Sequence, residues 1–184
     1  MPKLLVLFHA PSSDVVALAE AVVEGARSVR FAEVDLRRLV DPEAGAPAAA
    51  PEGGGRTHRT LDRAEDIAVY DGLILALPAA GDRGAVLTNM LAALGGSLLN
   101  KVGSAVTTAE GPGRTPVLWS ALAPMADRGM ILVPVPFTDT QEPAAESARR
   151  LGKRVAEVIA WVTHARSHHH HDHAPHDHQS HHHH

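Results

Sequence analysis

The chain has 184 residues, of which 45% are hydrophobic and only 3% aromatic, and its formal net charge is −4. This length suits one domain with a sizeable core and is short for two. The small net charge argues against a nucleic-acid binder, and the absence of cysteine excludes disulfides, thiol catalysis and cysteine-ligated zinc. No stretch reaches the roughly 18 consecutive apolar residues of a membrane span. We therefore expect a soluble, cytoplasmic protein with no membrane or nucleic-acid partner.

The N-terminal third predicts a strand, a helix and a second strand. Residues 4–8 form a continuous apolar run, which is typical of a strand buried on both faces of a parallel sheet. The polar turn 11–14 follows, and apolar residues then recur at helical spacing over 15–26. A second strand fits residues 30–36.

The middle of the chain predicts a surface excursion followed by one more strand. Residues 41–55 are rich in Pro, Ala and Gly and have no hydrophobic periodicity. A short helix over 61–70 then leads into a buried strand over 72–77. The loop 79–84 precedes a helix with its apolar stripe over 86–94.

The remaining elements continue the alternation of strand and helix. A strand over 102–107 is followed by the loop 108–115 and by a helix with its apolar side over 117–125. The last strand covers 130–135. A long amphipathic helix over 143–165 ends the regular structure.

Five strands that alternate with helices predict an α/β fold, in which a doubly wound parallel sheet carries helices on both faces. No G-x-G-x-x-G follows the first strand, which favours the strand order 2-1-3-4-5 over the dinucleotide-binding order. Ligands of such sheets bind beyond the carboxyl ends of the strands. The candidate site is therefore formed by the loops 9–14, 78–84 and 107–115. We expect one domain over 1–166 and a separate tail over 167–184.

A series of short motifs resembles one family. In chain order they are Tyr70-Asp71-Gly72-Leu73-Ile74, Leu77-Pro78, Leu94-Gly95-Gly96, Lys101, Thr107-Thr108 and the run from Arg128 to Pro134. Their order and spacing resemble the flavodoxin-like NAD(P)H:quinone oxidoreductases of the tryptophan-repressor-binding-protein type. The resemblance covers most of residues 3–165.

The resemblance implies an FMN-dependent enzyme that passes electrons from NAD(P)H to a quinone or another small-molecule acceptor. It identifies no catalytic side chain, because the flavin carries the hydride chemistry and the protein positions it. A Ser/Thr-rich turn at a helix N-terminus would hold the FMN phosphate, and two further loops would enclose the flavin ring. The residues implied are Ser12, Ser13, Asp14 and Val15 for the phosphate, and Pro78, Ala79, Ala80, Gly81, Asp82, Thr107, Thr108, Ala109, Glu110 and Gly111 for the ring.

The flavin loops depart from the family pattern, so the implied FMN site is degenerate. Ala10 and Ala17 stand where the family has Ser and Thr, and Asp14 adds a negative charge beside a phosphate. The loop Pro78–Arg83 is one residue shorter and lacks the family's Thr and aromatic residue. The connection Phe137–Pro143 lacks a long insertion that helps build the family's tetramer, which makes a tetramer doubtful and leaves a homodimer open.

Several site residues also have an ordinary structural interpretation. Ser12 and Ser13 are equally suited to capping the first helix. Thr107 and Thr108 are β-branched residues of the kind that strands favour. His9, at the end of the first strand, is more often a polar side chain satisfied by the backbone than a ligand contact.

The C-terminal tail carries a second signal, since eleven of its last seventeen residues are histidine. Neutral imidazole ligates Ni, Zn and Cu well, so the tract predicts transition-metal binding. Asp and other residues interrupt the histidines, which favours a native tail over an expression tag, and we expect it to be disordered without metal. The candidate ligands are His168, His169, His170, His171, His173, His176, His178, His181, His182, His183 and His184.

Two functions follow. One is the FMN-dependent reductase. The alternative is a flavodoxin-like domain with weakened or lost flavin binding that binds or buffers metal ions through its tail.

Overall fold

The computed structural model describes residues 1–8, 12–39, 58–61, 63–79, 91, 98–134 and 143–169. Within these residues, six strands form one sheet in the order β3-β2-β1-β4-β5-β6, and every neighbouring pair is parallel. The strands are β1 (Lys3–Phe8), β2 (Glu33–Leu39), β3 (Thr60–Leu61), β4 (Gly72–Leu77), β5 (Val102–Thr107) and β6 (Ile131–Leu132).

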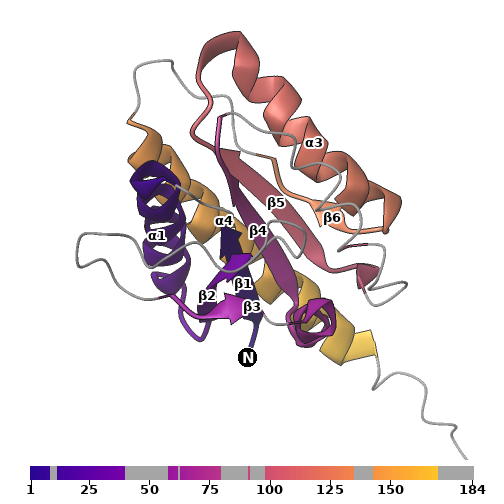
Figure 1. Cartoon of the computed structure of the whole chain (residues 1–184). Helices are drawn as coiled ribbons and strands as arrows, with labels where there is room; N and C mark the ends of the chain where they lie inside the picture. The colour runs from indigo at the N-terminus through magenta and orange to yellow at the C-terminus, as the bar shows by residue number, and fades with distance from the viewer. Residues whose placement is uncertain are drawn as a thin grey trace, which may run out of the picture.

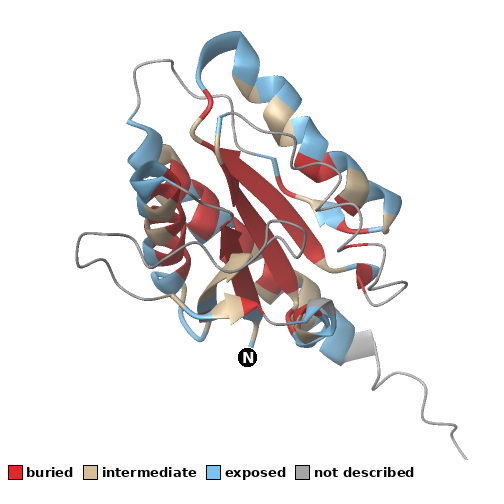
Figure 2. Cartoon of the chain, in the orientation of Figure 1, coloured by how far each residue is buried: buried red, intermediate tan, exposed pale blue. Residues whose placement is uncertain are grey.

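Helices cover both faces of the sheet (Figure 1). On one face lie α1 (Ser13–Arg27) and α4 (Ala144–His169), which pack against Leu4, Val6 and Ile74 and the other strand residues of that face. On the opposite face lie α3 (Arg114–Asp127) and the 3₁₀ helix η1 (Ala64–Val69), which pack against Leu5, Leu7 and Leu73. Figure 2 shows the buried central strands between these two layers. None of the helices described is long and apolar enough to cross a membrane.

The predicted fold class is confirmed, with a correction to the number of strands. The five predicted strands correspond to β1, β2, β4, β5 and β6, and they lie in the predicted order 2-1-3-4-5. The sixth strand, β3, pairs with the outer edge of β2, with Thr60 opposite Arg38 and Leu61 opposite Leu39. Two residues are too few to produce a hydrophobic alternation, so the sequence carries no signal for β3.

Other boundaries differ from the sequence-based expectations for local reasons. The second strand starts at Glu33 rather than residue 30, because residues 28–31 form a turn in which Phe31 has a positive φ of 66°. The short helix expected over 61–70 is the 3₁₀ helix η1, since Leu61 belongs to β3. The helix expected over 86–94 lies outside the described residues except for Leu91, which is helical and buried.

The two helices on the first face approach each other closely through glycine. A Cβ on Gly25 of α1 would lie 1.8 Å from the carbonyl oxygen of Arg149, and a Cβ on Gly152 of α4 would lie 2.0 Å from that of Val22. No residue with a side chain fits at either position without moving a backbone. This contact holds α1 against α4.

The segment between η1 and β4 is held by two polar side chains, the buried Tyr70 and the partly buried Lys101. The Tyr70 hydroxyl donates a 2.5 Å hydrogen bond to Asp35 Oδ2 on β2. Burial first, and this hydrogen bond second, raise the pKa of Tyr70 to about 12. From the start of β5, Lys101 Nζ donates to the carbonyl oxygens of Ala68 and Tyr70, and burial lowers the pKa of Lys101.

The raised pKa of Tyr70 can be measured directly, because the chain has only one tyrosine. Phenolate absorbance of the folded protein should titrate with a midpoint of about 12, against the ordinary value of 10.0 in denaturant. Since the folded pKa is the higher one, Tyr70 stabilises the fold below pH 10.0, and this stabilisation is lost as the pH rises to about 12. Asp35→Asn should lower the midpoint only part of the way, because burial remains. A folded-state midpoint equal to that in denaturant would contradict the assignment.

Candidate functional site

The candidate site lies at the carboxyl ends of β1, β4 and β5. The connection after β1 runs through α1 to β2, and the connection after β4 runs to β5 on the other side, so the chain departs in opposite directions from two adjacent strands. Such a switch point is where parallel α/β sheets bind ligands. The described residues of the predicted site are Ser12, Ser13, Asp14, Val15, Pro78, Ala79, Thr107, Thr108, Ala109, Glu110 and Gly111, whereas His9, Ala10, Ala80, Gly81 and Asp82 lie outside the described residues.

At the first loop, serine hydroxyls stand at the N-terminus of α1 without capping it. Ser12 is the N-cap residue, with extended φ and ψ of −118° and 146°, and its side chain makes no capping hydrogen bond. The hydroxyl of Ser13 donates to Asp14 Oδ1 at 3.4 Å. The capping interpretation of Ser12 is therefore not what the structure shows, and the hydroxyl stays exposed at the positive end of the helix dipole. Val15 is fully buried and belongs to the core that α1 forms with the sheet.

The second and third loops are tied together by two threonine side chains. The Ala79 N–H donates to Thr108 Oγ1 at 3.0 Å. The hydroxyl of Thr107 lies 3.5 Å from the carbonyl oxygen of Pro78 and accepts a 3.1 Å bond from the Ala109 N–H. Thr107 is only 6% exposed. Besides being β-branched residues at the end of a strand, Thr107 and Thr108 link the end of β4 to the end of β5 through their hydroxyls.

Beyond these threonines the chain turns sharply and becomes exposed. Gly111 has a positive φ of 54°, and a Cβ there would meet nothing within 4 Å, so backbone conformation rather than space accounts for this glycine. It opens the short 3₁₀ helix η3 (Gly111–Gly113), which leads into α3. Glu110 is exposed, whereas Ala109 is buried against the fold. The loop therefore presents backbone and one carboxylate to the site.

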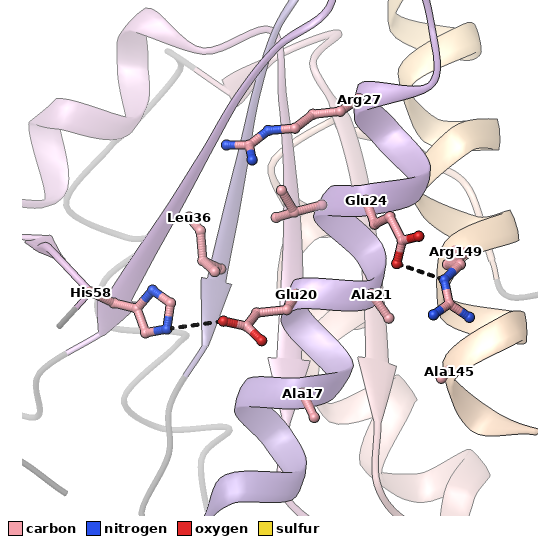
Figure 3. A pocket seen from close by; sticks show the side chains of 10 residues that line it. Ala17, Glu20, Ala21, Glu24, Arg27, Leu36, His58, Ala145 and Arg149 are labelled. Atoms are coloured by element: carbon pink, nitrogen blue, oxygen red, sulfur yellow. Dashed lines mark hydrogen bonds and ion pairs between the residues drawn. The ribbon is translucent and has the colours of Figure 1, made fainter. Parts of the chain in front are cut away.

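A second concave surface lies on the outer side of α1, between β2 and α4 (Figure 3). It is an open groove of about 980 Å³. Four of its ionisable side chains lie in two pairs: His58 Nε2 lies 3.6 Å from Glu20 Oε1, and Arg149 Nε lies 2.7 Å from Glu24 Oε2. Arg27 donates instead to the carbonyl oxygen of Val34, at 3.2 Å. Ala17, where the family resemblance would place a threonine, lines this groove.

His58 is a residue that the sequence analysis did not single out. Its ring meets the Phe8 ring edge-on, with the centroids 5.2 Å apart, at the last residue of β1. The side chain is largely buried. Nothing in the Pro- and Gly-rich sequence before it signals this position, because the contact is made between segments fifty residues apart.

The predicted metal ligands lie at or beyond the end of α4. This helix runs through Ser167 to His169, past the predicted domain boundary at residue 166. The side chains of His168 and His169, and all of His170 to His184, lie outside the described residues. Among the side chains that the structure does describe, no group of three or more His, Asp or Glu could hold a metal ion.

Comparison with known proteins identifies the family. No protein-family model matches the chain. An NAD(P)H dehydrogenase (quinone) from Acidithiobacillus ferrooxidans is 34% identical over 151 residues, which cover 77% of this chain and 74% of that protein. In fold, the chain is similar to oxidised flavodoxin 2 from Bacillus cereus, with a TM-score of 0.55, 13% identity and coverage of 87% and 99% of the two chains. It is similar to an archaeal flavodoxin to the same degree, with a TM-score of 0.54, 15% identity and coverage of 86% and 99%. With this relative and this fold, the chain belongs to the flavodoxin-like NAD(P)H dehydrogenase (quinone) family.

Proposed function

We propose that this protein binds FMN at the carboxyl edge of its sheet and reduces a quinone, or a similar small acceptor, with electrons from NAD(P)H. The observation that carries the proposal is the 34% identity to an NAD(P)H dehydrogenase (quinone) over three quarters of both chains. The switch-point loops of the fold support it, because they occupy the position at which flavodoxin-like sheets hold FMN. The assembly stays open between a homodimer and other states, with a tetramer doubtful.

The described residues at the first loop fit the phosphate of FMN. Ser12 and Ser13 offer hydroxyls, and the first turn of α1 offers the backbone N–H groups of Asp14 and Val15. Because the Ser12 side chain makes no capping hydrogen bond to the helix, it can serve a ligand instead. Hydroxyls and N–H groups at the positive end of a helix dipole are the chemistry that a phosphate requires.

The other two loops fit the edges of a flat ring. We place Pro78, Ala79, Ala80, Gly81 and Asp82 on one side and the segment from Thr107 to Gly111 on the other. These residues are mostly small, so the backbone of both loops can approach a ligand closely. The flavin supplies the hydride chemistry when it is bound, and the chain's own part is to hold the ring and limit its access to water.

The proposal is tested by adding FMN to the purified protein, desalting it and recording its visible absorption spectrum. We expect a retained flavin spectrum, and bleaching of that spectrum when NADH or NADPH is added without oxygen. A quinone should then restore the colour. The Gly111→Pro variant, which cannot adopt the positive φ of this turn, is expected to retain less flavin. A colourless protein that fails to retain added FMN would contradict the proposal.

Asp14 should weaken the binding of phosphate at this site. Its carboxylate lies in the first turn of α1, beside the proposed phosphate position. Asp14→Asn is expected to tighten FMN binding about fivefold, since two unit charges about 4 Å apart in water interact by about 1 kcal/mol. Riboflavin, which lacks the phosphate, should bind both proteins equally. The measurement is a titration of each flavin by fluorescence quenching.

Asp127→Asn provides the matched control, because Asp127 is exposed at the far end of α3. This variant should leave both affinities unchanged. The gain from Asp14→Asn should also shrink in about 1 M salt, where the Debye length falls to about 3 Å. An equal effect on FMN and riboflavin would show that Asp14 does not act through the phosphate.

We propose metal binding by the tail as a second function of the chain. Eleven histidines in seventeen residues favour it, and the described side chains offer no other group of metal ligands. Imidazole suits Ni, Zn and Cu. In the sequence, the tail continues directly from α4, which packs against the domain.

Deleting residues 167–184 should abolish binding of Ni, Zn or Cu without changing the affinity for FMN. The deletion keeps Arg166, whose guanidinium donates to the carbonyl oxygen of Asn100. Metal affinity of the full chain should fall as the pH drops through about 6.5, where imidazole becomes protonated. Isothermal titration with each metal measures both effects. Metal binding that survives the deletion would place the site in the domain instead.

A further inference from the structure

The hydrogen-bond ladder between β4 and β5 ends in an unusual way. The last pair in register is Leu77 with Thr107, and the Thr108 N–H donates to the carbonyl oxygen of Leu77 at 3.1 Å. If a parallel ladder continued, the Ala79 N–H would next donate to the backbone carbonyl of Thr108. It donates instead to the side-chain oxygen of Thr108, at 3.0 Å. A side chain thus takes the place of the backbone at the point where the two loops begin.

Thr107 and Thr108 use their hydroxyls differently. The Thr107 hydroxyl is buried and lies between the Ala109 N–H and the Pro78 carbonyl oxygen, so its partners are all within the loops. Thr108 is only partly buried. A hydroxyl has one proton to donate and two lone pairs to accept with, so accepting from Ala79 leaves the Thr108 hydroxyl a proton to donate.

The described part of the loop after β4 has few other polar groups that could fix its position. In its described part, Pro78 has no N–H group and Ala79 has no polar side chain, so side chains reach this loop through its backbone, at the Ala79 N–H and at the Pro78 carbonyl oxygen. Strand pairing sets the separation of β4 and β5 up to Leu77 and Thr107. Beyond that pair, the side-chain contacts described between the two loops are the 3.0 Å bond from the Ala79 N–H to Thr108 Oγ1 and the longer, 3.5 Å contact of the Thr107 hydroxyl with the Pro78 carbonyl oxygen. The bond between Ala79 and Thr108 is the shorter of the two.

We propose that Thr108 is a positioning residue for the flavin: its hydroxyl ends the β4–β5 ladder and sets the spacing of the two loops that hold the ring. This inference rests on the proposed FMN site. A fixed spacing means that less loop motion must be lost when a ligand binds, and such preorganisation raises affinity. The effect should concern the ring rather than the phosphate, because residues 78–79 follow β4 and residues 108–111 follow β5, whereas the proposed phosphate position follows β1.

Three variants test the role of the hydroxyl. Thr108→Val keeps the branched shape and removes the acceptor, and Thr108→Ser keeps the acceptor and removes a methyl group. Thr163→Val is the matched control, because Thr163 lies on α4 and bonds only to carbonyls of its own helix, Ile159 and Ala160, in the contacts described. Amide hydrogen exchange at Ala79 is measured in the flavin-free proteins. The dissociation constants of FMN and riboflavin are measured by fluorescence quenching.

We expect Thr108→Val to accelerate exchange at Ala79 and to weaken FMN and riboflavin binding by the same factor, about threefold to tenfold, as the loss of one hydrogen bond implies. Thr108→Ser should stay within about twofold of the unaltered protein, and Thr163→Val should change neither readout. Should Thr108→Val fold poorly, as judged by its melting curve, Thr108→Ala repeats the test with a smaller side chain and the same expected losses.

Three results would overturn the inference. The first is unchanged exchange at Ala79 when the hydroxyl is removed. The second is unchanged flavin affinity in Thr108→Val, and the third is a loss in Thr108→Ser as large as that in Thr108→Val. If the unaltered protein binds FMN and yet is insensitive to residue 108, this inference alone fails. If it binds neither flavin, the proposed function fails with it.

Discussion

The structure depends on the burial of β1 and β4 at the centre of the sheet. β1 is paired on both sides, with β2 and β4, so its backbone polar groups are satisfied within the sheet. Its side chains divide between the two cores, Leu4 and Val6 on one face and Leu5 and Leu7 on the other. Because both faces are covered by helices, a ligand can reach this part of the sheet only at the strand ends. The position of the candidate site therefore follows from the burial of these strands.

At those ends, the same groups serve the fold and the proposed ligand. A carboxylate in the first turn of α1 stabilises the helix through its dipole, yet Asp14 there competes with any anion that would use the same N–H groups. The threonines after β5 complete the hydrogen bonding of two loops and also set the opening between them. The close contact at Gly25 and Gly152 fixes α1, whose first turn belongs to the candidate site, against α4.

The groove beside α1 contrasts with the carboxyl edge in its chemistry. Glu20, Glu24 and Arg149 find partners within the protein, so the charges of the groove stabilise the packing of α1 against its neighbours. At the carboxyl edge, the Ser12 hydroxyl makes no capping bond and Glu110 is exposed. This difference supports the carboxyl edge, rather than the groove beside α1, as the place where a ligand would bind.

The long elements could be predicted from the sequence because each carries a complete pattern. The unbroken apolar runs of β1 and β4 and the helical stripe of α1 reflect burial that involves every residue of the element. The strand β3 could not be predicted in this way, since two residues carry no period. The predicted start of β2 was three residues too early, because a turn comes first in which Phe31 has a positive φ. Phenylalanine rarely adopts a positive φ, so the sequence does not indicate this turn.

For the site, the sequence was enough to predict which loops meet, because the alternation of strands and helices places every carboxyl end on one edge of a parallel sheet. It also named Ser12, Thr107 and Thr108 as the hydroxyls available there. What those hydroxyls do depends on the folded chain: Ser12 makes no capping hydrogen bond to its helix, and Thr108 accepts a hydrogen bond from Ala79. The bond to Ala79 joins residues 29 positions apart, and such contacts depend on how neighbouring strands end in space, which no local sequence pattern specifies.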